Sequence, residues 1–291
     1  MGMGNNFAVF ILTHGRPDNV KTYRTLRNQG YTGDIYIIVD NEDRTINKYQ
    51  HNFNGKVIIY NKQAIANNFD TGDNFSEHRS VFFPRNASFQ IASDLGLDYF
   101  LQLDDDYTSF VYKFTSSFIY KERRVLNLDK LFQIYLDFYK GIPAISIAMA
   151  QNGDFIGGRD SNIARHISLL RKCMNTFFCT THRPFEFVAR VNEDVATYTS
   201  LGHRGQLMLT IVNTAIIQTT TQNNPGGMSD LYKAEGTYIK SFYPIMYCPS
   251  FVKISMMGDK HRRLHHNISW NNAVPCILDQ KHRKSEVFEN G

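Results

Sequence analysis

Three consecutive aspartates, Asp104, Asp105 and Asp106, follow directly on the apolar run 99–103. Adjacent carboxylates are costly to ionise together unless a cation neutralises them. If the chain alternates as a strand does, Asp104 and Asp106 point to one side and Asp105 to the other. Mg²⁺ and Mn²⁺ prefer oxygen ligands and are commonly held by one or two carboxylates together with a substrate phosphate. The triplet therefore predicts a divalent-cation site, with a solvated acidic turn as the alternative.

A second acidic pair, Glu193 and Asp194, follows Asn192 in the second half of the chain. A carboxylate can act as the general base that takes a proton from a hydroxyl, provided that it comes within hydrogen-bond reach. The pattern also suits the start of a helix, which Asn192 would cap while the two acids interact with its positive end. The two roles are compatible. Of the two acids we prefer Asp194 as the base.

His261, His265 and His266 lie close together in a stretch that is otherwise basic. Imidazole is a good ligand for Mn²⁺ or Zn²⁺, so His265 or His266 could complete a metal shell. Alternatively, the whole stretch 260–266 grips phosphate. The four cysteines form no C-x-x-C pair, so neither an independent zinc site nor a disulfide scaffold is expected.

Basic and aromatic residues interleave at 112–114, 120–124 and 182–185. Such stretches suit a nucleic-acid groove, where cations meet phosphates and rings stack on bases, although most surface Lys and Arg only solubilise a protein. The glycine-rich stretch 223–229 predicts an acceptor-side loop, because glycine permits close backbone approach. It places Gly226, Gly227 and the following Lys233 among the expected acceptor-binding residues.

The first third of the chain alternates between short apolar runs and helical patterns. The runs at 7–13, 34–39, 56–60 and 99–103 predict strands that are buried on both faces. Between them we expect one helix that starts at 15–18 and ends at Gly30, a second over 44–50, a polar loop over 61–79 and a third helix over 84–95. This rhythm predicts a parallel sheet with right-handed crossovers.

In such a sheet, ligands bind beyond the carboxyl ends of the strands. The residues expected at that edge are Thr13, His14, Arg16, Asp40, Lys62 and the aspartate triplet. No G-x-G-x-x-G follows the first strand, which weakens a dinucleotide interpretation, and no G-x-x-x-x-G-K-[ST] occurs, which excludes a P-loop.

The second half of the chain is less regular. We expect helices over 128–139 and 193–201, strands over 144–150, 207–209 and 214–217, and a polar surface segment after His265. Without tandem repeats or a Pro/Ser-rich linker, residues 1–291 should form one α/β domain. Within it we expect an α/β half (7–114), a mixed α+β half (115–275) and a C-terminal tail (276–291).

Composition excludes several classes of protein. Lysine plus arginine number 32 and aspartate plus glutamate 27, and the resulting net charge of +5 is compatible with a polyanionic partner without requiring one. No apolar run approaches the 18 residues of a membrane span, and the first residues match neither a secretory signal nor a myristoylation site. We therefore expect a cytoplasmic protein without a membrane partner, and we infer no obligate protein partner.

The triplet after its apolar strand, with Arg85 and Asn86 on the preceding helix, resembles the D-x-D motif of GT-A-type glycosyltransferases. The segments 226–233, 236–243 and 265–275 resemble a narrower group, the TET/JBP-associated glycosyltransferases, which are largely bacteriophage proteins. The resemblance implies a Rossmann-like, mostly parallel sheet flanked by helices. It also implies a UDP-sugar donor whose diphosphate is bridged by Mn²⁺ or Mg²⁺. The residues implied in donor binding are Thr13, His14, Arg16, Asp40, Lys62, Arg85, Asn86, Asp104 and Asp105, and those implied in metal binding are Asp104, Asp106, His265 and His266.

The resemblance further implies that the acceptor is the hydroxyl of a 5-hydroxymethylpyrimidine in double-stranded phage DNA, and hence a place in the cytoplasm of an infected host. A base in the Glu193–Asp194 pair predicts inversion at the sugar carbon. Without a carboxylate that faces the acceptor, a retaining mechanism would apply. The alternatives are a glycosyltransferase with a protein, lipid-linked or cell-wall acceptor, a nucleotidyltransferase on the same fold, and a catalytically silent DNA-binding module.

Overall fold

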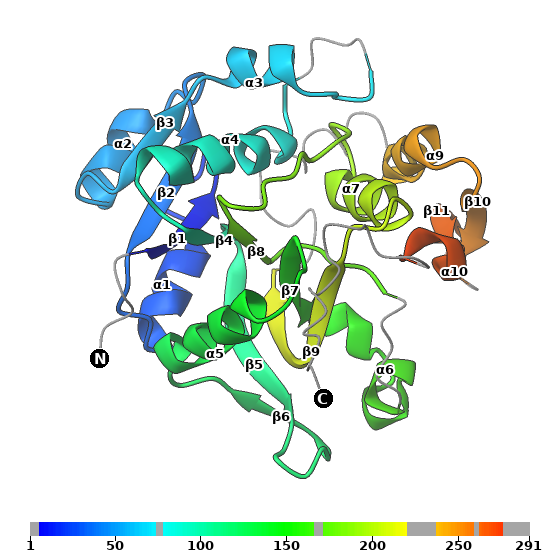
Figure 1. The fold of residues 1–291 in the computed structure, drawn as a ribbon. Helices are drawn as coiled ribbons and strands as arrows, with labels where there is room; N and C mark the ends of the chain where they lie inside the picture. The colour runs from blue at the N-terminus through cyan, green and yellow to red at the C-terminus, as the bar shows by residue number, and fades with distance from the viewer. Residues whose placement is uncertain (1–5, 74–77, 166–170, 220–236, 259–261, 276–291) are drawn as a thin grey trace, which may run out of the picture.

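The computed structural model describes residues 6–73, 78–165, 171–219, 237–258 and 262–275 (Figure 1). A large mixed sheet runs through the molecule, and its strands follow the order β3-β2-β1-β4-β8-β7-β9-β5-β6. A small two-stranded sheet, β10-β11, lies at one side. The expected α/β class is thus confirmed.

The first four strands are parallel. They are β1 (Phe7–Leu12), β2 (Ile35–Asp40), β3 (Val57–Tyr60) and β4 (Tyr99–Asp104). The helices between them are α1 (Lys21–Asn28), α2 (Ile46–Asn52), α3 (Lys62–Asn68) and α4 (Phe82–Asp94). This succession is the predicted βαβ rhythm, and it brings the ends of all four strands to one edge of the sheet.

The sheet is covered on both faces, which explains why its central strands are apolar throughout. Val9 and Ile11 of β1 face a core that includes side chains of α1, α2 and α5 (Leu128–Lys140). Ala8 and Phe10 face the opposite core, which is formed with α3 and α4. Helices therefore flank the sheet in three layers, as the GT-A resemblance implies.

Beyond β4 the sheet becomes mixed. β4 pairs with the antiparallel β8 (Phe177–Thr180), β8 with the antiparallel β7 (Ser146–Gln151), and β7 with the parallel β9 (Met208–Gln218). The outermost strands are β5 (Tyr107–Phe114) and β6 (Tyr120–Arg124), which form a hairpin on the far side of β9. Figure 1 shows this hairpin projecting from the body. The predicted mixed second half is thus confirmed in the order of the strands.

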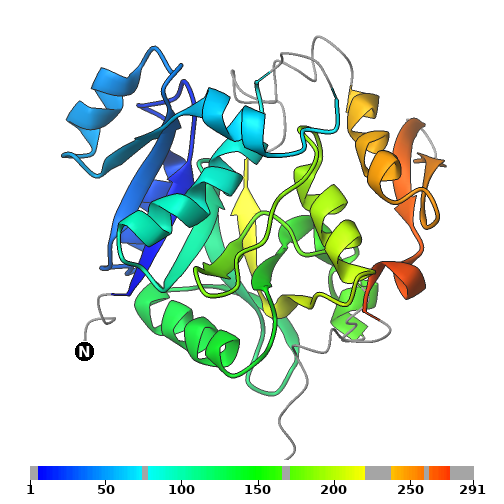
Figure 2. The same ribbon diagram turned by 45° about the horizontal axis from the view of Figure 1, so that its top comes forward.

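The remaining elements lie around the second half. They are the 3₁₀ turns Asn152–Phe155, Gly158–Asp160 and Thr237–Ser241 (η1, η2 and η3), and the helices α6 (Asn162–Arg165), α7 (Glu193–Gly202), α9 (Tyr243–Tyr247) and α10 (Trp270–Ala273). β10 (Val252–Met257) and β11 (Arg263–Ile268) form the small antiparallel sheet, which lies with α9 and α10 beside α7 (Figure 2).

Several predicted boundaries were wrong. The first helix begins at Lys21 and not at 15–18, because the amides of Gly15 and Arg16 instead donate to Asp43 and Tyr49. The expected loop 61–79 contains α3, whose first turn is capped when Asn61 Oδ1 accepts from the amide of Ala64 at 3.0 Å. The two short strands predicted at 207–217 are one strand, β9.

Within 112–114 and 120–124, which were predicted as groove residues, three side chains support the fold, whereas Lys121, Arg123 and Arg124 are exposed and their role stays a prediction. Lys113 is fully buried, and its ammonium bonds to Asn152 at 2.7 Å and pairs with Glu122. Phe114 and Tyr120 pack their rings against Phe155. These three side chains hold the β5–β6 hairpin to the body, so they are unable to contact phosphates or bases.

Candidate functional site

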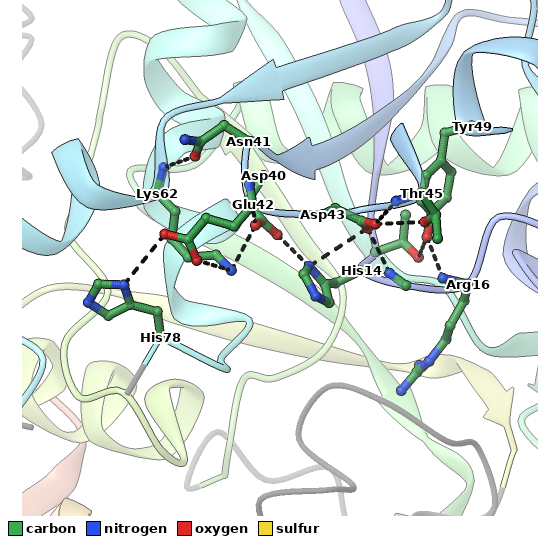
Figure 3. A network of polar contacts seen from close by, with 12 residues as sticks. His14, Arg16, Asp40, Asn41, Glu42, Asp43, Thr45, Tyr49, Lys62 and His78 are labelled. Atoms are coloured by element: carbon green, nitrogen blue, oxygen red, sulfur yellow. Dashed lines mark hydrogen bonds and ion pairs between the residues drawn. The ribbon is translucent and has the colours of Figure 1, made fainter. Parts of the chain in front are cut away.

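The carboxyl ends of β1, β2 and β3 meet in a polar network (Figure 3). Asp40, at the end of β2, bonds to the Nδ1 atom of His14 at 2.6 Å and to the ammonium of Lys62 at 2.7 Å. Glu42 lies 3.4 Å from the same ammonium. The hydrogen bond to Asp40 raises the pKa of His14, whose side chain remains 42% exposed. Strand-end residues predicted from the sequence are thus brought together in one place.

Asp43 stabilises the conformation of the β1–α1 loop through hydrogen bonds. One of its oxygens accepts from the amide of Gly15 at 2.7 Å, and the other accepts from the amide and hydroxyl of Thr45. Gly15 has φ +70°, a backbone conformation that favours glycine. Tyr49 completes the support, because its hydroxyl accepts from the amide of Arg16 at 2.8 Å. Neither Asp43 nor Tyr49 was predicted, and the only sequence signal for Asp43 is its place in the acidic run after β2.

Asp105 faces into the protein. Its carboxylate accepts from the hydroxyl of Thr13 at 2.6 Å and pairs with the guanidinium of Arg16 at 3.1 Å. Both of its oxygens are therefore engaged by the β1–α1 loop, and only 5% of the residue is exposed. Asp105 and Thr13 join β4 to the end of β1, a supporting role that differs from the predicted contact with a donor.

Asp104 and Asp106 are in a different situation. Asp104 has 28% of its side chain exposed, and it pairs with Arg85 at 3.0 Å. Among the described residues Asp106 makes no ion pair, and burial together with the charges of Asp104 and Asp105 raises its pKa to about 7. Two carboxylates with too little positive charge around them fit a divalent cation.

Arg85 connects this aspartate pair to the second acidic pair. Its guanidinium lies over the ring of Phe177, 5.0 Å from the centroid, and only 1% of the side chain is exposed. Nη2 donates to Asp104 at 3.0 Å and Nε donates to Glu193 at 2.9 Å. The third nitrogen, Nη1, is buried and has no hydrogen-bond partner in the structure. Arg85 was predicted at the donor site, but its pairing with Glu193 was not.

Glu193 and Asp194 begin α7 and are both buried. Burial and the charge of Asp194 raise the pKa of Glu193 to about 7, while burial also raises the pKa of Asp194. Asp194 Oδ1 accepts from the amide of Val195 at 2.7 Å. Asn192 has a left-handed backbone, φ 60°, and its side chain makes no capping bond. The sequence-based alternative, in which Asn192 caps the helix, is therefore wrong.

Asn86 lies beneath the site, where its side chain is bonded to Phe187. Its amide nitrogen donates to the carbonyl of Phe187 at 3.0 Å, and its oxygen accepts from the amide of the same residue at 2.8 Å. Only 3% of Asn86 is exposed. These bonds and its burial give Asn86 a structural role in fixing the segment before α7, and its predicted contact with a donor stays a prediction.

The histidines lie on β11, close to the start of α7. The rings of His265 and His266 are 4.3 Å apart, and His266 Nδ1 lies 3.3 Å from the side-chain nitrogen of Asn192. Among the described residues, no three His, Cys, Asp or Glu side chains are grouped so that they could hold a metal ion. A role for His265 or His266 beside Asp104 and Asp106 at a metal stays a prediction.

The predicted acceptor-binding residues Gly226, Gly227 and Lys233 lie outside the described residues.

A further cluster beside the site was missed by the sequence reasoning. The buried guanidinium of Arg190 bonds to Asp73 at 3.0 Å and donates to the hydroxyl of Tyr243 at 2.9 Å. The neighbouring amides of Ala189 and Arg190 donate to the carbonyls of Asp70 and Thr71. The cluster ties the segment before Glu193 to the chain that follows α3. No local pattern signals it, because its members lie far apart in the sequence.

A family model described as TET-associated glycosyltransferase matches residues 7–227. The chain belongs to this family. It is therefore an enzyme, a glycosyltransferase, as the resemblance implied. The match includes both acidic pairs and Arg85, whereas β10, β11 and their histidines follow it. No curated protein matches the chain.

Solved structures with similar folds include glucosyl-3-phosphoglycerate synthase from Mycobacterium tuberculosis in complex with Mg²⁺ and UDP, at 10% identity and a TM-score of 0.42 over 91% of this chain and 88% of that chain. Another is S. aureus TarS, with 12% identity and a TM-score of 0.39; the match covers 82% of this chain and 65% of that chain. A nucleotide-diphospho-sugar transferase from Desulfovibrio desulfuricans has 10% identity, a TM-score of 0.38 and coverage of 83% and 94%. At these values the likeness assigns no residue or substrate to this glycosyltransferase. In the described part of the enzyme, no helix is both long and apolar enough to span a membrane.

Proposed function

We propose that this glycosyltransferase moves a sugar from a UDP-sugar to the hydroxyl of a 5-hydroxymethylpyrimidine in double-stranded phage DNA, with inversion and with the help of Mn²⁺ or Mg²⁺. One observation carries the proposal: the guanidinium of Arg85 bonds to both Asp104 and Glu193. The end of β4, which is suited to a metal and a diphosphate, is thus linked through Arg85 to the start of α7, which is suited to a general base.

The metal would be held by Asp104 and Asp106, whose charges are poorly compensated within the described residues. Once bound there, a divalent cation supplies positive charge that stabilises the departing diphosphate. Asp105 would support the metal site without binding the metal, because its bonds to Thr13 and Arg16 hold the turn that carries Asp104 and Asp106. The hydroxyl of Thr22 adds support by donating to the carbonyl of Asp104 at 2.6 Å.

The nucleoside end of the donor would bind at the network of His14, Asp40 and Lys62. This network lies at the carboxyl edge of the parallel strands, which is where ligands bind in open α/β sheets. It presents a partly exposed imidazole next to a carboxylate, a pair that can donate to and accept from a base or a ribose. The assignment of uridine as the base comes from the family resemblance.

We assign the general base to Asp194. Glu193 already accepts a charge-assisted hydrogen bond from Arg85, whereas among the described residues Asp194 forms no ion pair. Its raised pKa brings the carboxyl closer to neutral pH, where a base is most effective. Glu193 would orient the start of α7 through Arg85. Direct attack by the deprotonated hydroxyl would invert the sugar carbon.

The DNA acceptor is supported by the family to which the chain belongs, whose members are proposed to modify hydroxymethylated bases. The 5-substituent of a pyrimidine projects into the major groove, which is wide enough to admit protein elements. The enzyme could therefore reach the hydroxyl without flipping the base out of the duplex.

The test is mass spectrometry of nucleosides from duplexes that carry 5-hydroxymethylcytosine or 5-hydroxymethyluracil, after incubation with UDP-sugars and Mn²⁺. A hexose or pentose mass on the modified base, absent with unmodified duplex and with Asp194→Asn, supports the proposal. Release of UDP without any modified nucleoside would point to a non-DNA acceptor. Pyrophosphate release from nucleoside triphosphates would point to nucleotidyl transfer.

A further inference from the structure

Three basic residues from separate parts of the chain lie around the start of α7: two of them interact electrostatically with Asp194, and the third, Arg263, interacts with Lys240. The three are Lys172, which precedes β8, Lys240 in η3, and Arg263 at the start of β11. Lys172 and Lys240 both lie close enough to Asp194 to interact electrostatically with it. The cluster therefore borders the side of α7 that carries the proposed base.

Hydrogen bonds connect these parts of the chain. The side chain of Asn192 donates to the carbonyl of Lys240 at 3.0 Å and lies 3.3 Å from His266 Nδ1. The hydroxyl of Ser241 donates to the carbonyl of Leu264 at 3.3 Å, which joins η3 to β11. The cluster is thus built on backbone held directly against the residue before Glu193.

Positive charge dominates this place. Asp154 pairs with Lys172 at 3.1 Å, but it also pairs with Arg171 at 3.0 Å. Burial and the neighbouring cations Lys240 and Lys172 lower the pKa of His266, to about 4, and lower that of His265 in the same direction. Besides burial, both shifts reflect the cations that surround the two imidazoles.

His265 offers a further polar group to a ligand. Its Nδ1 atom is buried and has no hydrogen-bond partner among the residues that the structure describes. A neutral imidazole can donate from one of its ring nitrogens. Lys and Arg side chains next to such a donor are the groups that bind phosphate oxygens in proteins.

We infer that Lys172, Lys240 and Arg263, together with His265, form a phosphate-binding subsite beside Asp194. This inference rests on the proposed function, which supplies two sources of phosphate: the backbone of the acceptor DNA and the diphosphate of the donor. In either case the subsite holds a reactant next to the proposed base. Binding experiments with DNA and with UDP distinguish which of the two phosphates the subsite binds.

The experiment measures binding and needs no turnover. Arg263→Gln is the main variant, because Arg263 is exposed and its replacement should leave the fold intact. Lys240→Gln is the second variant. The matched controls are Lys130→Gln on α5 and Arg24→Gln on α1, which remove exposed charges outside the cluster and outside the predicted groove stretches. Thermal unfolding of each variant checks that it is folded.

Fluorescence anisotropy follows binding to an unmodified duplex between 50 and 200 mM salt, and calorimetry follows binding to UDP with Mn²⁺. For a DNA phosphate, we expect Arg263→Gln to weaken duplex binding and to reduce the log–log salt slope by about 1, with no such change in the controls. For a donor phosphate, UDP binding weakens instead. Either result supports the subsite.

Unchanged affinity for both ligands in folded Arg263→Gln and Lys240→Gln would overturn the inference, as would an equal loss in the controls on α1 and α5. Because the duplex is unmodified and no sugar is transferred, the result does not depend on whether hydroxymethylpyrimidine is the true acceptor. Failure of the subsite and failure of the proposed function can therefore be distinguished.

Discussion

Asp104 and Glu193 share one buried guanidinium: Arg85 donates to the first through Nη2 at 3.0 Å and to the second through Nε at 2.9 Å. The two acids come from different halves of the chain, one from the end of β4 and the other from the start of α7. Any shift of one acid is thus felt by the other. Arg85 therefore connects the proposed metal site at Asp104 to the proposed acceptor site at the start of α7 through two hydrogen bonds.

Replacing Arg85 should disable the enzyme in two separable ways. Arg85→Met leaves the buried carboxylate of Glu193 without its partner, and we expect it to cost about 3–5 kcal/mol of unfolding free energy. Arg85→Lys keeps the charge but cannot reach both acids in the same geometry, and we expect a loss of about 10²-fold in kcat with a smaller loss of stability. Urea unfolding and steady-state kinetics check both. Full activity of Arg85→Lys would show that the shared pairing does not matter for turnover.

Asp106→Asn should separate activity from stability. The substitution removes one of three adjacent carboxylates, so it relieves repulsion, and in metal-free buffer near pH 8 we expect it to stabilise the fold by on the order of 1 kcal/mol. Transfer should nevertheless be abolished, because the cation loses one of its proposed ligands. Thermal unfolding and donor turnover are the measurements. A destabilised variant with normal turnover would contradict both parts.

The stability of the metal-free enzyme should fall as the pH rises from about 6.5 to 8, a window that lies above the range in which the lowered pKa values of His265 and His266 act in the opposite direction. The pKa values of Asp106 and Glu193 are both raised to about 7, from ordinary values of 3.8 and 4.5. In that interval the folded protein holds protons that the unfolded chain has released, so the free energy of unfolding decreases with pH. His14 acts in the same direction, because its pKa is raised and its favourable charged form is lost as the pH rises.

Urea unfolding at several pH values checks this slope. Saturating Mn²⁺ and UDP should flatten it, since a bound cation favours the ionised carboxylates that are costly without it. Stability that increases with pH in the absence of metal would show that these carboxylates are ionised in the folded protein.

Substitutions of Asp40 and Asp43 should affect the donor KM differently, although the two residues are only three positions apart. Asp40→Asn weakens the contacts to His14 and Lys62, and we expect it to raise the donor KM about 10- to 100-fold and also to lower stability, because the buried ammonium of Lys62 loses its nearer carboxylate. Asp43→Asn instead weakens the bonds to Gly15 and Thr45 that shape the loop, and we expect about 1–3 kcal/mol of destabilisation. Kinetics and thermal unfolding of both variants check the contrast. A greater rise in donor KM for Asp43→Asn would reverse the two roles.

The parallel half of the fold was predictable from the sequence. Each of the four apolar runs is bounded by polar residues and is short enough for a strand, and the strand-end acids at 40 and 104–106 follow them directly. Such patterns are local, because a strand buried on both faces needs apolar side chains at every position. The resemblance of the D-x-D motif relied on the same local order, so the family could be expected before the structure.

The antiparallel strands and the partners of the site residues required the tertiary structure. β5 and β6 carry mixed aromatic and basic residues, and only their contacts show that Lys113 is buried and that Phe114 supports the hairpin. Arg85 and Glu193 are 108 positions apart, and Arg190 and Asp73 are 117 apart. Local sequence pattern determines which face of an element is apolar, but it does not say which distant charge will lie opposite a buried carboxylate. That choice depends on how the two halves pack, since a buried charge must be paired wherever the fold places it.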